Sequence, residues 1–157
     1  MTMSVMEAFD NDMQIPFIGF GAKLPPFFST ASSCFAVNGD IFKPECNGVQ
    51  GIMDTYDKGI HKIEQHGPSA FSSVIDFVTQ FVGQTPVTQN EQFYSILVII
   101  TNGSIQDYQA TVNSVVEATK YPISIVIVTV GSENISKIRK LDGDDNDLVN
   151  SNNNEKA

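Results

Sequence analysis

The stretch Ile96-Leu97-Val98-Ile99-Ile100-Thr101-Asn102-Gly103 decides the predicted fold of this chain. Its five consecutive apolar residues are mostly β-branched, which is typical of a strand buried on both faces of a parallel sheet. In an open α/β sheet, ligands bind at the loop that leaves the carboxyl end of such a strand. Thr101, Asn102 and Gly103 are therefore predicted to lie on a binding rim.

Strand-like and helix-like segments alternate on both sides of this stretch. Apolar runs predict strands at 15–20, 34–37, 94–101 and 123–130, and apolar residues at helical spacing predict helices at 49–63, 71–82, 108–119 and 135–141. Strands that alternate with helices of this length form βαβ units. The predicted fold class is therefore α/β with a mostly parallel sheet flanked by helices.

The composition limits the class of protein. A chain of 157 residues is long enough for one domain with a real core, and its net charge of −9 leaves no basic surface for nucleic acid. Cys34 and Cys46 form no zinc motif and are expected to be free thiols. Because no stretch has the length of a membrane span, we expect a soluble, cytoplasmic protein.

The polar residues after the central strand allow two interpretations. Asn102-Gly103 is the sequence of a tight hairpin turn, but the helical pattern from Tyr108 favours a strand-to-helix loop. Asp107 then stands at the N-cap of the following helix, and capping alone accounts for it. A ligand role for Asp107 is the alternative.

Gly67-Pro68-Ser69 places a hydroxyl just before the helix at 71–82. Ser69 is explained by helix capping, while the alternative makes it a metal or anion ligand on the same rim as Asn102.

Other functional motifs fail on inspection. Gly19-Phe20-Gly21 lacks the third glycine of a dinucleotide site, and the acidic turn that begins at Asp142 has Asp147 and Asn153 where a calcium loop needs glycine and glutamate. The two histidines have no nucleophile at a recognisable spacing, so no catalytic group is predicted.

Four segments together resemble the copine family, in its C-terminal von Willebrand factor A-type domain. They are the GFGA-type segment and prolines of 17–26, the E-C-x-G-[IV]-x-G-[IV] helix entry of 45–52, the Tyr-Pro-Ile-Ser-Ile of 121–125, and the Leu-Asp-Gly-Asp-Asp of 141–145. Each is weak alone, but their order and spacing are specific.

The resemblance implies a doubly wound sheet with a metal-ion-dependent adhesion site that holds Mg²⁺ or Mn²⁺ at its carboxyl edge. The hydroxyl of the second site loop corresponds to Ser69, and the aspartate of the third loop corresponds to Asn102. The D-x-[ST]-x-S motif of the first loop is missing. The resemblance thus predicts an incomplete fold without its first central strand, in which residues 1–14 are a remnant of the first helix and a linker and 15–147 a partial domain. The polar composition of 148–157 predicts a disordered tail.

The replacement of aspartate by Asn102 weakens the expected metal site. Divalent ions prefer anionic oxygen ligands, and a unit charge pair at about 4 Å in an effective dielectric of about 20 contributes about 4 kcal/mol. Asn102 offers a carbonyl oxygen without that charge. We therefore expect a degenerate site and no bound cofactor.

The resulting functional hypothesis is a non-enzymatic protein-interaction module that binds a protein partner and no nucleic acid. The resemblance implies membrane recruitment only indirectly, through calcium-dependent C2 domains that these residues do not include. The alternative is a small hydrolase-like α/β enzyme with its site on the same rim. The predicted rim consists of Gly67, Pro68, Ser69, Thr101, Asn102, Gly103 and Asp107.

Overall fold

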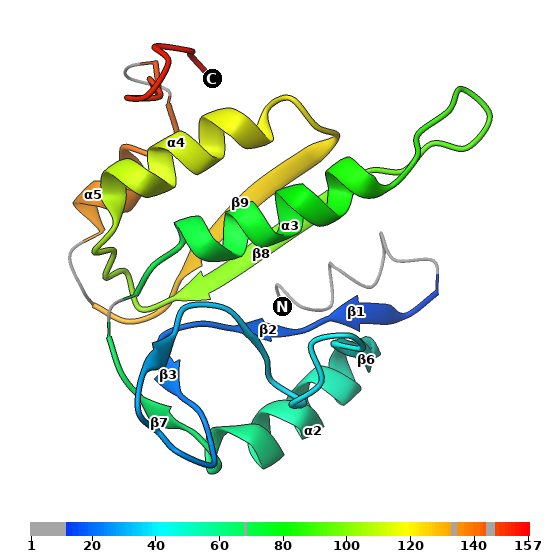
Figure 1. Cartoon of the computed structure of the whole chain (residues 1–157), viewed down its shortest axis with the longest axis vertical. Coiled ribbons are helices and arrows are strands. Elements are labelled where there is room, and N and C mark those ends of the chain that lie inside the picture. The colour runs from blue at the N-terminus through cyan, green and yellow to red at the C-terminus, as the bar shows by residue number, and fades with distance from the viewer. Residues whose placement is uncertain (1–11, 68, 133–134, 144–146) are drawn as a thin grey trace. The chain divides into compact units, whose positions relative to one another are not determined.

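The computed structural model describes residues 12–67, 69–132, 135–143 and 147–157. The chain divides into two compact units, residues 1–67 and 68–157, and each is described by itself (Figure 1). The prediction of one partial domain over 15–147 stays a prediction, and the predicted helix remnant of 1–14 falls almost entirely outside the described residues.

The first unit contains short antiparallel strand pairs. β1 (Gln14–Pro16) pairs with β6 (Glu45–Asn47), β2 (Ile18–Gly19) pairs with β5 (Phe35–Ala36), and β3 (Ala22–Lys23) lies between β4 (Ala31–Ser32) and β7 (Glu64–Gln65). The predicted strands at 15–20 and 34–37 are therefore confirmed as extended segments, but they are shorter than predicted. Gly21 has a φ of 70°, a conformation that favours glycine, and it ends the first extended segment.

Helix α2 (Gly48–Ile60) packs on these strands. Ile52 forms a small core with Ile15 and Cys46. The apolar residues whose helical spacing predicts this helix include Ile52, Met53 and Tyr56, but only Ile52 is buried, and Met53 and Tyr56 are exposed. Gly59 is buried instead, and a Cβ there would come within 2.9 Å of a methyl group of Val37. The segment that contains Val37 therefore lies too close to α2 for a side chain at position 59.

The second unit contains one βαβ unit, as the sequence predicted. β8 (Ser95–Thr101) pairs in parallel with β9 (Ile123–Thr129), with Ser95 opposite Ile123 and Thr101 opposite Thr129. Helix α4 (Tyr108–Ala118) connects them. Asn102-Gly103 therefore begins a strand-to-helix loop, and the hairpin alternative is wrong.

Helix α3 (Ser72–Gln84) packs against α4 and contacts β8 (Figure 1). The core of this unit is made by fully buried side chains, among them Phe71 just before α3, Ile75 on α3, and Thr111 and Val116 on α4. A short helix, α5 (Ser136–Arg139), follows β9.

Two expectations about the sheet need correction. Mixed α/β structure is confirmed, but β8–β9 is the one parallel pair among the described residues, and the remaining pairs are antiparallel. Nor is β8 buried on both faces: Ile99 and Thr101 are buried, whereas Ile96 and Ile100 are 44% and 46% exposed. Successive side chains of a strand point to opposite faces, so helix cover on a single face accounts for this alternation.

The segment after residue 147, for which the sequence predicts a disordered tail, contains hydrogen-bonded turns in the structure. Leu148 is 8% exposed and Asn150 is 5% exposed. The backbone N–H of Asn150 donates to the carbonyl of Glu155 at 2.8 Å, and that of Ala157 donates to Leu148 at 3.0 Å. Short asparagine side chains bond to nearby backbone and form tight turns without an apolar core.

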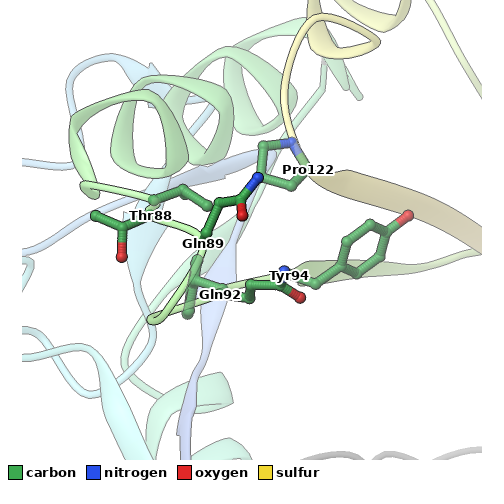
Figure 2. Close-up of a pocket in the computed structure, with 7 residues that line it drawn as sticks. Thr88, Gln89, Gln92, Tyr94 and Pro122 are labelled. Atoms are coloured by element: carbon green, nitrogen blue, oxygen red, sulfur yellow. The ribbon is translucent and has the colours of Figure 1, made fainter.

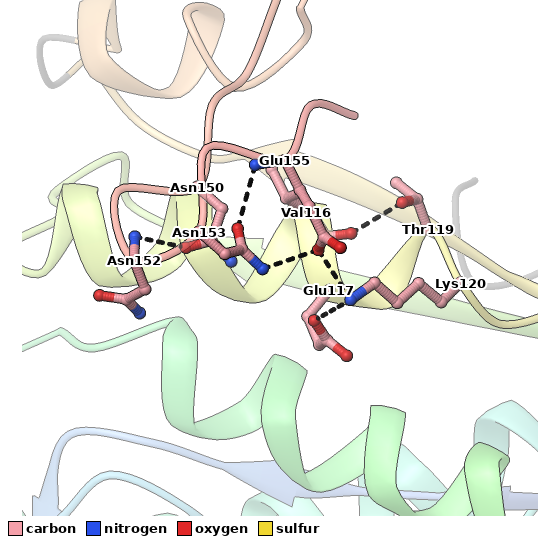
Figure 3. Close-up of polar contacts among 8 residues, drawn as sticks. All are labelled: Val116, Glu117, Thr119, Lys120, Asn150, Asn152, Asn153 and Glu155. Atoms are coloured by element: carbon pink, nitrogen blue, oxygen red, sulfur yellow. Dashed lines mark hydrogen bonds and ion pairs between the residues drawn. The ribbon is translucent and has the colours of Figure 1, made fainter.

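This segment is bonded to α4 and the turn after it. The Oδ1 of Asn113 accepts from the backbone N–H of Ser151 at 2.9 Å. The Nζ of Lys120 lies 2.7 Å from an oxygen of Glu155 and 2.8 Å from one of Glu117 (Figure 3). The C-terminal segment after residue 147 is therefore part of the second unit.

No helix within the described residues is long and apolar enough to cross a membrane.

Candidate functional site

The predicted rim lies at the carboxyl end of β8. Ser69 is half-buried ahead of α3, and its carbonyl accepts from the backbone N–H of Gln106 at 3.3 Å. This bond brings Ser69 to the loop that contains Thr101, Asn102 and Gly103. Gly67 belongs to the first unit, and Pro68 lies outside the described residues.

Asp107 is the best-bonded residue of the rim. Its carboxylate accepts from the backbone N–H groups of Phe71 at 3.1 Å and Ser72 at 2.9 Å, and from the Oγ1 of Thr111 at 3.0 Å. The residue occupies the N-cap position of α4 as predicted, yet its side chain makes no capping bond to the backbone of that helix. It caps α3 instead, from more than thirty residues away in the sequence.

The charge of Asp107 is favoured by these bonds. Partial burial alone would raise the pKa of the carboxyl group, but hydrogen bonds from the side chain and backbone of Ser72, from Phe71 and from Thr111 outweigh burial and lower the pKa. The partial positive charge at the amino end of a helix has the same sign of effect. Asp107 is therefore ionised at neutral pH and bonded within the protein.

The other rim residues also bond to their own loop. Thr101 is buried and its Oγ1 accepts from the N–H of Gly103 at 3.2 Å, while the Oδ1 of exposed Asn102 accepts from the N–H of Ser104 at 3.2 Å. Gly103 has a φ of 103°, which an L-residue with a side chain adopts only with strain. The loop is thus fixed by short-range bonds.

These residues do not fit a divalent metal ion. The one carboxylate of the rim, that of Asp107, already accepts hydrogen bonds from Phe71, Ser72 and Thr111, which leaves neutral oxygens on Ser69 and Asn102. Hard cations prefer anionic oxygens in greater number. Among the described residues, no group of three or more His, Cys, Asp or Glu side chains could hold a metal.

A hollow that the sequence did not predict lies at the end of β8 opposite to the rim. Its volume is about 460 Å³, and Figure 2 shows it between the connector that follows α3 and the turn before β9. Uncharged side chains line it: Val87, Thr88, Gln89, Gln92, Phe93, Tyr94 and Pro122. The signal in the sequence is Phe93-Tyr94, two adjacent aromatic residues at the start of β8.

The described geometry defines a mixed α/β protein with a hydrogen-bonded corner where β8, α3 and α4 meet. A family model described as Copine matches residues 1–156, and the chain belongs to the copine family. The resemblance found in the sequence is thereby confirmed. Membership supports a role in membrane or protein interaction at the level of the family.

Proposed function

We propose that this chain is a non-enzymatic protein-interaction module and that the rim at the end of β8 binds its partner without a metal ion. The observation that carries the proposal is the bonding of Asp107, whose charge is used to hold α3. The side chains that the rim and its loop offer a partner are exposed and neutral: Asn102 of the rim, and Ser104 and Gln106 of the loop between Gly103 and Asp107.

Preorganisation supports binding at this surface. The loop is held by bonds from Thr101 to Gly103, from Asn102 to Ser104 and from Gln106 to Ser69. A surface that is already ordered loses little conformational entropy when a partner docks.

The enzyme alternative has less support. Ser69 and Ser104 carry hydroxyl groups, but the rim contains no histidine or cysteine, and its carboxylate is occupied. A serine nucleophile needs a base within hydrogen-bond reach. We also propose, from copine membership and the parallel pairing of β8 with β9, that the chain forms part of a doubly wound von Willebrand factor A-type sheet and that the protein acts in the cytoplasm.

The test uses a partner that is first identified by affinity capture with the full chain and then purified. Binding is measured by calorimetry in EDTA for two variants that each remove two exposed amides, Asn102→Ala/Gln106→Ala at the rim and Gln89→Ala/Gln92→Ala at the opposite end of β8. We expect about tenfold weaker binding for the rim variant, which corresponds to about 1.4 kcal/mol, and little change for the control.

Three outcomes would contradict the proposal. The first is that EDTA abolishes binding, and the second is that only the control variant loses affinity. The third is robust turnover of a hydrolase substrate that disappears on Ser69→Ala, which would establish the enzyme alternative.

A further inference from the structure

The hollow at the start of β8 is lined by exposed apolar side chains. It lies between the connector of residues 85–94 and the turn before β9 (Figure 2), and its volume of about 460 Å³ is in the range of ligand pockets. Val87 is 49% exposed, Phe93 40% and Tyr94 62%. Aromatic side chains that are exposed together mark interaction sites. All of the lining residues belong to the second unit, so this unit alone forms the hollow.

Hydrogen bonds fix the walls of the hollow. In the connector, the N–H of Thr88 donates to the carbonyl of Glu91 at 3.0 Å, and the N–H of Glu91 donates to the Oγ1 of Thr88 at 3.0 Å. The hydroxyl groups of Tyr94 and Ser124 lie 2.7 Å apart, which holds the tyrosine ring against β9. Because the site is already shaped, a ligand that enters it orders few side chains, and little conformational entropy is lost.

The charge around the hollow is negative. The sequence has no lysine or arginine between positions 67 and 119, and the exposed carboxylate of Glu91 forms no ion pair among the described residues. Lys120 is the basic residue next to the lining, two positions before Pro122. Its Nζ lies 2.8 Å from an oxygen of Glu117 and 2.7 Å from one of Glu155 (Figure 3), so two carboxylates more than balance this one ammonium group. A ligand with positive charge is therefore attracted to this end of the unit.

The polar groups of the lining suit a peptide backbone. Gln89 and Gln92 face the hollow, and their side-chain amides have no hydrogen-bond partner among the described residues. Each amide can both donate and accept a hydrogen bond, as the N–H and C=O groups of an extended peptide require. An apolar small molecule would leave these groups unused.

We propose that this hollow binds an extended segment of a partner protein in which an aromatic side chain is flanked by lysine or arginine. The aromatic side chain packs against Phe93 and Tyr94, the amides of Gln89 and Gln92 bond to the backbone of the segment, and a basic side chain lies beside Glu91. This site is separate from the rim and does not depend on the function proposed there.

The experiment is an NMR titration of the full chain with blocked pentapeptides, followed through backbone amide signals. The probe is acetyl-Gly-Arg-Phe-Arg-Gly-amide, and its two analogues replace the phenylalanine by alanine or both arginines by glutamate. We expect saturable shifts at residues 89, 92 and 94 with the probe. The alanine analogue should bind about tenfold more weakly, because it buries no aromatic side chain, and the glutamate analogue should not bind. Added salt should weaken binding of the probe, since the charges are exposed and screened.

Two further arms test other occupants of the hollow. An acetylated tetraproline amide tests a polyproline segment, and a dilution series without peptide tests a second copy of the chain. We expect the signals of residues 89, 92 and 94 to stay unchanged in both arms.

Two variants with matched controls test the residues. Tyr94→Ala should weaken binding of the probe about tenfold, whereas Phe81→Ala removes an aromatic side chain of similar exposure, 60%, outside the hollow and should have no effect. Glu91→Gln should weaken binding about threefold, within the range for one exposed charge pair. Its control, Asp76→Asn, removes an exposed carboxylate of α3 and should have no effect. Melting temperatures of the four variants separate a loss of binding from a loss of folding.

The proposal is overturned if the probe gives no saturable shifts, or if either analogue binds as well as the probe. It is also overturned if the tetraproline amide binds more tightly, if dilution alone moves the same signals, or if each variant behaves like its control.

Discussion

Replacing Asp107 by alanine should destabilise the second unit, because one carboxylate holds together the beginnings of two helices. The change removes the carboxylate that accepts from the N–H groups of Phe71 and Ser72 and from the hydroxyl of Thr111. Each unsatisfied group costs about 1 kcal/mol at the lower end of the usual range, which suits a half-buried site. The expected loss is about 3 kcal/mol, of which the lost cap of α3 alone accounts for about 1 kcal/mol.

The measurement is urea unfolding followed by circular dichroism, with thermal melting as a check. A loss of this size lowers the melting temperature of a chain of this length by roughly 9 °C. Asp142→Ala, which removes an exposed carboxylate from the same unit, should change stability by less than about 0.5 kcal/mol. If Asp107→Ala and Asp142→Ala unfold at the same urea concentration, the assignment of the cap is wrong.

A double-mutant cycle isolates one of the three bonds. Thr111→Val in the wild-type background should cost about 1 kcal/mol, since it removes a hydroxyl that donates to Asp107. In the Asp107→Ala background it should cost nothing, because the hydroxyl has already lost its acceptor. A coupling energy near zero would show that the bond from Thr111 to Asp107 does not contribute to stability.

The folding stability should fall at acidic pH because of Asp107. The pKa of Asp107 in the folded protein lies below its ordinary value, because the hydrogen bonds to the carboxylate outweigh its partial burial, so the folded state favours the ionised form. The resulting stabilisation is fully present above the unfolded-state pKa and is lost as the pH falls through the lower folded value. Asp107→Asn should therefore flatten the fall in stability below about pH 4. An unchanged acid profile in Asp107→Asn would contradict this account.

The remaining predictions concern packing, the C-terminal segment and metal. Gly59→Ala should destabilise the protein by about 2 kcal/mol, because its Cβ would lie 3.0 Å from the carbonyl oxygen of Val37. The control is Gly51→Ala in the same helix, whose Cβ meets only ordinary contacts and should stabilise the protein. Equal unfolding midpoints for the two variants would refute the close approach of Gly59 to Val37. Leu148→Ala should cost about 2 kcal/mol and increase amide exchange throughout 148–157, and a segment that exchanges freely in the wild type would refute its folded state. Mg²⁺ or Mn²⁺ should leave the melting temperature unchanged in the wild type and in Asn102→Asp, and a saturable rise at micromolar metal would refute the donor-set argument.

The sequence predicted the elements well where local pattern decides structure. β8, α4 and β9 were found from consecutive β-branched residues and helical spacing, and their parallel pairing followed from the intervening helix. α2 was also found, but its buried face was predicted only in part, because a glycine gives no apolar signal. The close approach of Gly59 to Val37 is a tertiary contact, which the spacing of apolar residues does not predict.

The candidate site was predicted by position but not by bonding. The sequence placed Asp107 before a helix, and any aspartate there is expected to cap that helix. Its real partners, Phe71 and Ser72, depend on how two loops meet in space. The C-terminal segment was missed for a related reason, since low hydrophobicity predicts disorder while asparagine turns and contacts with α4 order it.

The bond between Asp107 and Ser72 also constrains the order in which the second unit folds. It closes a loop of about 35 residues, and such closure carries an entropy cost that grows with the logarithm of loop length. The amino end of α3 therefore remains frayed until β8 has docked and delivered the carboxylate. A nascent chain released before residue 107 lacks that contact, so we expect α3 and α4 to pack together late in folding and in a single cooperative step.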